Sequence, residues 1–122
     1  MTKHVLTVPI VRPPMSANEA RRFHWAKQRE AKRVAEQLVF ASAKCAGLPK
    51  NLPPSHVSII WFAPDKRRRD PDGLGPFQKA CLDSLVHYGA FEDDDHTHIL
   101  STTTSIKHDG PARIEIHITE EP

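Results

Sequence analysis

Residues 57–89 read VSIIWFAPDKRRRDPDGLGPFQKACLDSLVHYG, a strand pattern, a charged loop and a helix pattern in succession. The apolar run 57–62, rich in β-branched and aromatic residues, predicts a mostly buried strand. Pro76 is typical of a first helical position, and Gly89 of the residue just after a helix. The buried face of this helix is expected to comprise Phe77, Cys81, Leu82 and Leu85. A strand leading into a helix in this way indicates a layered α/β fold.

Before this stretch, alternating apolar residues predict a first strand over Val5–Ile10, which ends at the prolines of 12–14. Ser16 and Asn18 then offer helix-capping side chains. A long helix is predicted over Trp25–Ala46, with Gly47 as its stop. Its apolar stripe is expected to contain Ala31, Val34, Ala35, Leu38, Ala41, Ser42 and Cys45.

After this stretch, a strand is predicted over Thr97–Ile106 and another over Arg113–Thr119, joined by a turn at Asp109-Gly110. In the last strand three isoleucines alternate with polar residues, which is the pattern of a half-buried strand. The order β-α-β-α-β-β predicts an α/β fold with a single-layer mixed sheet packed by two main helices. We expect residues 1–122 to form one domain.

The cysteines and the hydropathy of the chain indicate its compartment. Cys45 and Cys81 lie far apart on predicted helices among apolar neighbours, so we expect two reduced core thiols. No stretch approaches the roughly 20 apolar residues of a membrane span, and the first 11 residues do not resemble a signal peptide. We therefore expect a cytoplasmic protein with no membrane partner.

Charge is distributed unevenly along the chain. Residues 1–69 contain 14 Lys and Arg against 4 Asp and Glu, whereas residues 70–122 contain 3 against 11. A basic surface beside an acidic pocket suits a metal-dependent nuclease, because cations attract DNA phosphates and carboxylates hold the metal. Uneven surface charge without a polyanionic partner is the alternative that the charge balance leaves open.

Two groups of carboxylates are candidates for a metal site. Asp70 and Asp72 are two positions apart, and an extended backbone would point both to one face, where Mg²⁺ or Mn²⁺ could lie between them. A solvated Asp-Pro-Asp-Gly turn is the alternative. Acids at 92–95 follow the predicted end of the second helix, where the helix dipole is already negative, so a compensating cation is plausible. One or more of Asp93, Asp94 and Asp95 could complete the site.

Cations near these acids are candidates for contacts with DNA. Lys79 could stabilise charge on a scissile phosphate, or it could simply pair with Asp83 one helical turn away. Arg67, Arg68 and Arg69 directly precede the first carboxylates, and guanidinium groups bind phosphate bidentately. The candidates on the first helix are Lys27, Arg29, Lys32 and Arg33.

Two further features favour structural roles. His96 and His98 would share one face of a strand and could bind zinc, but nothing nearby completes a tetrahedral site. Peripheral positions are therefore expected for both histidines. Trp25 could stack on an unpaired base, although core packing beneath the first helix is the expected role.

The segment 67–95, RRRDPDGLGPFQKACLDSLVHYGAFEDDD, resembles the core motif of the RusA-like Holliday junction resolvases, crossover junction endodeoxyribonucleases of phages and prophages. The family pattern is an arginine run, Asp-x-Asp-Asn-Leu, Lys-Ala leading to Asp-x-Leu, a Gly and an Asp-Asp pair. Its elements fall on Arg67–Arg69, Asp70, Asp72, Leu74, Lys79-Ala80, Asp83-Ser84-Leu85, Gly89 and Asp93-Asp94. Gly73 replaces the usual Asn, and an apparent insertion at Gly75–Phe77 lengthens the interval before Lys79.

This resemblance implies a RusA-like fold and a homodimer that binds four-way DNA junctions and nicks two strands symmetrically, in recombination and repair. It also implies that Asp70, Asp72 and Asp94 bind metal and that Lys79 is catalytic, with Asp93 as a further candidate ligand. We expect phosphodiester hydrolysis by water that Mg²⁺ activates, with Mn²⁺ able to substitute. The alternatives are a nuclease for flaps or forks, a catalytically inactive DNA-binding module and a metal-stabilised structural protein.

Overall fold

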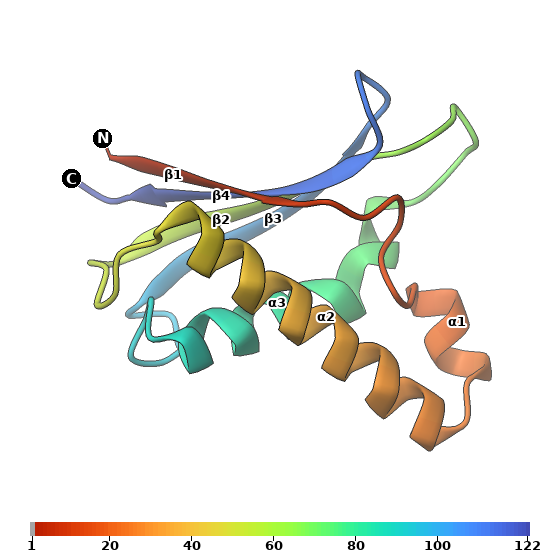
Figure 1. The fold of residues 1–122 in the computed structure, drawn as a ribbon, viewed down its shortest axis with the longest axis horizontal. Helices are drawn as coiled ribbons and strands as arrows, with labels where there is room; N and C mark the ends of the chain where they lie inside the picture. Colours follow the sequence, from red (N-terminus) through yellow and green to blue (C-terminus); the bar gives the residue numbers. More distant parts are fainter. Residues whose placement is uncertain (1) are drawn as a thin grey trace.

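The chain forms a four-stranded mixed sheet with its helices packed against one side (Figure 1). The structure is a computed structural model and describes residues 2–122. In chain order its elements are β1 (Lys3–Val8), α1 (Ala17–Arg22), α2 (Trp25–Ala46), β2 (Ser55–Phe62), the 3₁₀ helix η1 (Pro71–Leu74), α3 (Gly75–Tyr88), β3 (Ile99–Lys107) and β4 (Arg113–Glu120). This confirms the predicted α/β fold and its order of strands and main helices, and adds α1 and η1.

The strand order is β1-β4-β2-β3. β4 pairs antiparallel with both β1 and β2, whereas β2 and β3 are parallel neighbours. A parallel pair needs a crossover connection, and η1 with α3 provides it. The connection from β2 to β3 therefore contains both groups of acids and Lys79.

The core lies between the sheet and helices α2 and α3. Ile114, Ile116 and Ile118 are fully buried, as the alternation in this strand predicts. Their register partners on β1 and β2 include Leu6, Val8, Val57 and Ile59, which bury the same face of the sheet. Since side chains alternate along a strand, the polar residues between them lie on the opposite face.

α2 has the predicted bounds, but its buried face differs from the predicted stripe. Ala35 and Ser42 are buried as expected, whereas Ala41 is exposed and Val39 and Ala43 are buried instead. The helix contacts both β1 and α3, and its buried residues recur one turn apart along this contact. Alanines occur on several faces of α2, so their spacing alone could not distinguish the buried face.

The two cysteines lie in different environments. Cys81 is buried and burial raises the pKa of its thiol, in agreement with a core position. Cys45 is exposed, so the predicted core position is wrong for this residue. It lies in the last turn of α2. Both thiols are free.

The chain between β1 and α2 differs from the prediction. β1 is Lys3–Val8 rather than Val5–Ile10, and Pro9, which has no amide donor, follows its last residue. The helix α1 was not predicted. Ser16 Oγ accepts a hydrogen bond from the Glu19 amide and Glu19 Oε1 accepts one from the Ser16 amide, both at 3.1 Å. This capping box was the sequence signal for α1.

Trp25 is not a core residue, and the expected packing beneath α2 is wrong. Its side chain is 61% exposed at the first position of α2. Figure 1 shows the reason, since the N-terminal half of α2 extends beyond the sheet. An apolar side chain there has no sheet to pack against.

None of the helices in residues 2–122 has the length and apolarity that crossing a bilayer requires.

Gly89 ends α3 in a left-handed conformation, with φ of +99°. We expect Gly89→Ala to lower the free energy of unfolding by about 1 kcal/mol, because a Cβ is strained at this φ. A Cβ would also lie 3.4 Å from Cδ of Lys50. Chemical denaturation measures the change. Gly75→Ala is the matched control, since Gly75 has φ of −50° and no atom within 4 Å of an added Cβ; equal destabilisation by both variants contradicts the prediction.

Candidate active site

Asp70 and Asp72 lie at the start of η1. Asp70 has an extended backbone (φ −99°, ψ 132°), but Asp72 lies within the 3₁₀ helix, so the predicted extended segment is wrong at the second carboxylate. Pro71 at the first helical position and the hydrogen bond from the Gly73 amide to the Asp70 carbonyl, at 2.9 Å, form this turn. The prediction that both carboxylates point to one face assumed an extended backbone. This assumption does not hold at Asp72, so it cannot be used to place the two side chains together.

Both carboxylates are exposed and available to a ligand. Asp70 does not cap η1 with its side chain. Among residues 2–122, neither Asp70 nor Asp72 has a hydrogen-bond or ion-pair partner for its carboxylate. Two neighbouring acids without a protein partner are suited to binding a cation.

Lys79 connects α3 to the acidic loop that follows it. Its Nζ lies 3.0 Å from Oδ1 of Asp83, one helical turn away, and 3.3 Å from Oδ2 of Asp94, in the loop before β3. The Lys79 side chain is nevertheless 63% exposed. The predicted pair with Asp83 is therefore confirmed, and Lys79 also lies beside the second acidic group, whereas its predicted contact with a scissile phosphate stays a prediction. The residues between Gly73 and Phe77 are helical, and Lys79 reaches Asp94 in spite of the longer interval.

The charge of Lys79 is stabilised by both contacts. Its hydrogen bonds to Asp83 and then to Asp94 raise the pKa of Lys79 above the usual lysine value. Asp83 also binds Lys32 of α2, with Nζ 3.1 Å from Oδ2. Burial opposes ionisation of Asp83, but the bonds from Lys79 and Lys32 outweigh it and lower its pKa. At neutral pH Lys79 is a cation, so it is suited to stabilising negative charge rather than to accepting a proton.

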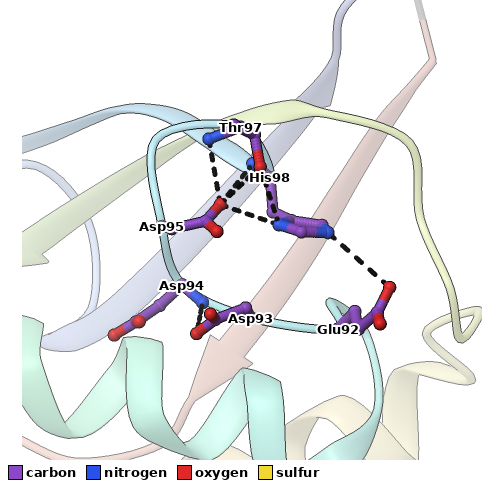
Figure 2. Close-up of polar contacts among 6 residues, drawn as sticks. All are labelled: Glu92, Asp93, Asp94, Asp95, Thr97 and His98. Carbon is purple, nitrogen blue, oxygen red and sulfur yellow. Dashed lines mark hydrogen bonds and ion pairs between the residues drawn. The ribbon is translucent and has the colours of Figure 1, made fainter.

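The acids of the second group point in different directions (Figure 2). Asp93 Oδ1 accepts a hydrogen bond from the Asp94 amide at 2.7 Å. The Asp94 side chain points away from Asp95, and its carboxylate contacts Lys79. Asp95 accepts hydrogen bonds from Thr97 Oγ1 at 2.6 Å and from the Thr97 amide at 3.0 Å. Of the three aspartates, Asp94 is the one in contact with the candidate catalytic lysine.

The Asp95 turn also explains two differences from the sequence prediction. Amides of His98 and Ile99 donate to the Asp95 carbonyl, so β3 begins at Ile99 rather than Thr97. His96 and His98 consequently lie in a turn and do not share a strand face. His98 pairs with Asp95 at 2.8 Å and more weakly with Glu92 at 3.8 Å. His98 is therefore paired with acids of the loop, and a peripheral role of the two histidines stays a prediction.

His98 provides a test of this loop in solution. The hydrogen bond with Asp95 raises the pKa of His98 above 6.5, so its stabilising effect is complete below that pH and is lost as the pH rises through the higher folded-state value. Asp95→Asn should return the pKa of His98 toward its ordinary value, as followed by an NMR pH titration. Asp93→Asn, which removes a charge but no hydrogen bond to His98, should change it less. An unchanged titration in Asp95→Asn contradicts the turn.

The three arginines before Asp70 are not equivalent. Arg67 and Arg68 are exposed, and neither side chain has a partner within residues 2–122. The Arg69 side chain is only 17% exposed, pairs with Asp65 at 2.9 Å and lies over the Trp61 ring at 4.8 Å. Arg67 and Arg68 are therefore available to an external anion, whereas Arg69 holds the loop in shape.

The basic residues of α2 also differ in their contacts. Lys27 lies over the Phe23 ring at 4.2 Å, and Arg29 lies over Trp25 at 5.5 Å. Arg33 pairs with Glu30, while Lys32 pairs with Asp83. In the view of Figure 1, the loop 63–70 lies at the upper right and the first half of α2 at the lower right, so both lie toward one end of the long axis but on different levels relative to the sheet. All four cations remain exposed, so this end of the molecule carries much of the excess positive charge.

The carboxylates do not form a ready metal centre. Among residues 2–122, no three His, Cys, Asp or Glu side chains gather in a metal-binding arrangement. The donor chemistry nevertheless fits a hard divalent cation, since Asp70 and Asp72 offer exposed oxygens without partners. One carboxylate oxygen of Asp94, Oδ2, accepts a hydrogen bond from Lys79, and the other carboxylate oxygen is left for a cation.

Comparison with known proteins bears on this arrangement. No protein-family model matches the chain. The chain is 39% identical over 64 residues to the crossover junction endodeoxyribonuclease RusA of Enterobacteria phage HK97. These 64 residues are therefore similar to RusA. The match covers 52% of the chain and 50% of the phage protein, so the chain spans about half the length of the curated relative that it matches. The resemblance inferred from the sequence is confirmed.

The RusA-like pattern can now be compared with the geometry. The structure brings together Lys79 and Asp94, which are 15 positions apart. Asp70 directly precedes η1 and Asp72 lies within it, and η1 contacts both α3 and β3. The carboxylates of the first group do not contact Asp94 in a ligand cluster within the described residues. Asp83, considered from the sequence only as an alternative partner, is a second neighbour of Lys79.

Proposed function

We propose that this chain is an endodeoxyribonuclease that resolves four-way DNA junctions with a divalent cation, Mg²⁺ foremost. The observation that carries the proposal is the contact between Lys79 and Asp94, because it joins two residues of the RusA-like pattern across 15 positions of sequence. The similarity to a phage protein named as a crossover junction endodeoxyribonuclease supports the substrate class.

In this proposal the carboxylates hold the cation and the lysine acts beside it. Asp70, Asp72 and Asp94 are the proposed metal-binding residues, with Asp93 as a further candidate. When bound, a divalent cation stabilises charge on the phosphate and activates water for attack on phosphorus. Lys79 contacts a non-bridging phosphate oxygen and stabilises the charge that develops there. Asp83 positions Lys79 and keeps it protonated.

The cations at the same end of the molecule are proposed to hold the DNA arms. Arg67 and Arg68 are exposed and free to bind phosphate bidentately. Phosphate contacts from α2 would extend this surface. The proposed residues on α2 are Lys27, Arg29, Lys32 and Arg33. Arg69 is proposed to contribute by holding the loop of the two free arginines in place through Asp65 and Trp61. Since a four-way junction is nearly two-fold symmetric, a homodimer is proposed to make the paired nicks. We place this activity in DNA recombination and repair, for a phage-encoded protein in the host cytoplasm.

Cleavage of three synthetic substrates tests the proposal. A four-way junction, a flap and a plain duplex are incubated with the protein in Mg²⁺, and in EDTA as control. The expected result is symmetric paired nicking of the junction in Mg²⁺, no cleavage of the duplex, and no cleavage of any substrate in EDTA. Equal cleavage of all three substrates contradicts junction specificity but retains a nuclease. Binding of the junction without cleavage supports an inactive DNA-binding module instead.

A further inference from the structure

A pocket of about 350 Å³ lies between the first half of α2 and the first turns of α3. Its walls come from three parts of the chain, including the segment that connects β1 to α1. The residues that line it are Pro14, Met15, Trp25, Gln28, Arg29, Ala31, Lys32, Ala35, Pro76, Phe77 and Lys79. Its volume is within the range of small-molecule sites.

Trp25 is the exposed aromatic side chain of this pocket. Trp25 is 61% exposed, so much of its large apolar ring lies in water. A flat ligand stacked on the ring would remove this apolar surface from water. The neighbouring His24 ring lies at 5.3 Å and the Arg29 guanidinium at 5.5 Å from the indole. The indole also lines a second hollow with Arg29, Glu30 and Arg33, but of these two hollows only the first is also lined by Lys79.

The charged side chains that line the pocket are Arg29, Lys32 and Lys79. Lys32 and Lys79 are both paired with Asp83, which lies outside the lining, whereas Arg29 has no carboxylate partner among the described residues. Gln28 is held in place because its Nε2 donates to the Ala20 and Phe23 carbonyls, at 2.7 and 2.9 Å. Both amide protons are thereby used, which leaves Oε1 of Gln28 as an acceptor. An aromatic face, a fixed acceptor and three cations together match a nucleobase attached to its phosphates.

The pocket adjoins the candidate active site through a shared residue. Lys79 lines the pocket and also contacts Asp94. A nucleotide whose base lies against Trp25 would therefore have its phosphate near the residue proposed to stabilise the scissile group. Stacking would then fix the position of the strand relative to Lys79.

We propose that this pocket binds an unpaired nucleobase of the DNA strand next to the cleavage position, with Trp25 stacking on the base and Arg29 and Lys32 contacting its flanking phosphates. The proposal rests on the proposed function, since DNA is taken as the ligand. It adds a recognition element for DNA that is not fully paired. A plain duplex offers no free base and should not use the pocket.

Binding without cleavage tests this pocket. A fluorescent single-stranded dT12 oligonucleotide, the same oligomer with abasic sites throughout, and a blunt duplex are titrated in EDTA, and fluorescence anisotropy is recorded. Trp25→Ala is expected to weaken binding of dT12 about tenfold and to leave binding of the abasic oligomer and of the duplex within about twofold. Val11→Ala, which truncates another exposed apolar side chain, is the matched control and should change none of the three.

A second readout uses the fluorescence of Trp25 itself. In a Trp61→Phe background Trp25 is the one remaining tryptophan, and dT12 should quench it whereas the abasic oligomer should not. Unchanged binding of dT12 by Trp25→Ala, or equal quenching by both oligomers, overturns the pocket. If either of these two results is found and the protein still cleaves junctions, only the proposal that the pocket binds a base is wrong. If no form of DNA binds, the proposed function is wrong as well.

Discussion

Asp72→Asn is expected to lower the rate of junction cleavage by about 100- to 1000-fold, with junction binding in EDTA changed by less than about threefold. Asparagine keeps the shape of the side chain but removes the negative charge that a divalent cation requires. The carboxylate is exposed and has no partner within the described residues, so the fold should not depend on it. Single-turnover cleavage of a labelled junction and a binding titration measure the two quantities.

Asp109→Asn is the matched control for this experiment. Asp109 is another exposed carboxylate of the acidic half, in the turn between β3 and β4, and it has no proposed role in the site. The Asp109→Asn variant should cleave junctions at the wild-type rate. Cleavage at the wild-type rate by Asp72→Asn would show that the proposed site is wrong. Loss of binding and cleavage together would mean that Asp72 acts on DNA binding rather than on the chemical step.

Phe91→Ala is expected to lower the free energy of unfolding by about 3–5 kcal/mol. Phe91 is 1% exposed and belongs to the main core, so truncation leaves a cavity that the surrounding helices and sheet cannot fill. Such a change is a large part of the roughly 5–15 kcal/mol by which a domain of this kind is stable. Urea denaturation measures the change.

Leu100→Ala provides the comparison for Phe91→Ala. Leu100 is 40% exposed on β3, and its truncation should change the unfolding free energy by no more than about 0.5 kcal/mol. A loss below about 1 kcal/mol in Phe91→Ala would contradict the core position. Phe91 directly precedes the acidic loop, so Phe91→Ala should also make the position of Asp94 less fixed. At urea concentrations below the unfolding midpoint, this variant should therefore cleave junctions more slowly than wild type.

Much of the candidate site could be named from the sequence, but not its geometry. The RusA-like pattern singled out Lys79 and Asp94, and their contact is consistent with it. The same pattern could not show that Asp95 is occupied by Thr97 and His98, or that Arg69 is held against Trp61. Hydrogen bonds of a turn and stacking between separate segments depend on the folded path of the chain, which residue spacing does not specify.

The sequence by itself determined the local elements of this protein. Each local signal depends on residues only a few positions apart, so it can be recognised in the sequence. These signals are the alternation through Ile116, the helix ends at Gly47 and Gly89, and the capping box at Ser16. Tertiary structure decided which strands became neighbours, which face of α2 was buried, and that Trp25 stayed in solvent. These outcomes depend on contacts between residues distant in sequence. Asp94 is the clearest case, since only the crossover from β2 through α3 to β3 brings its carboxylate to Lys79.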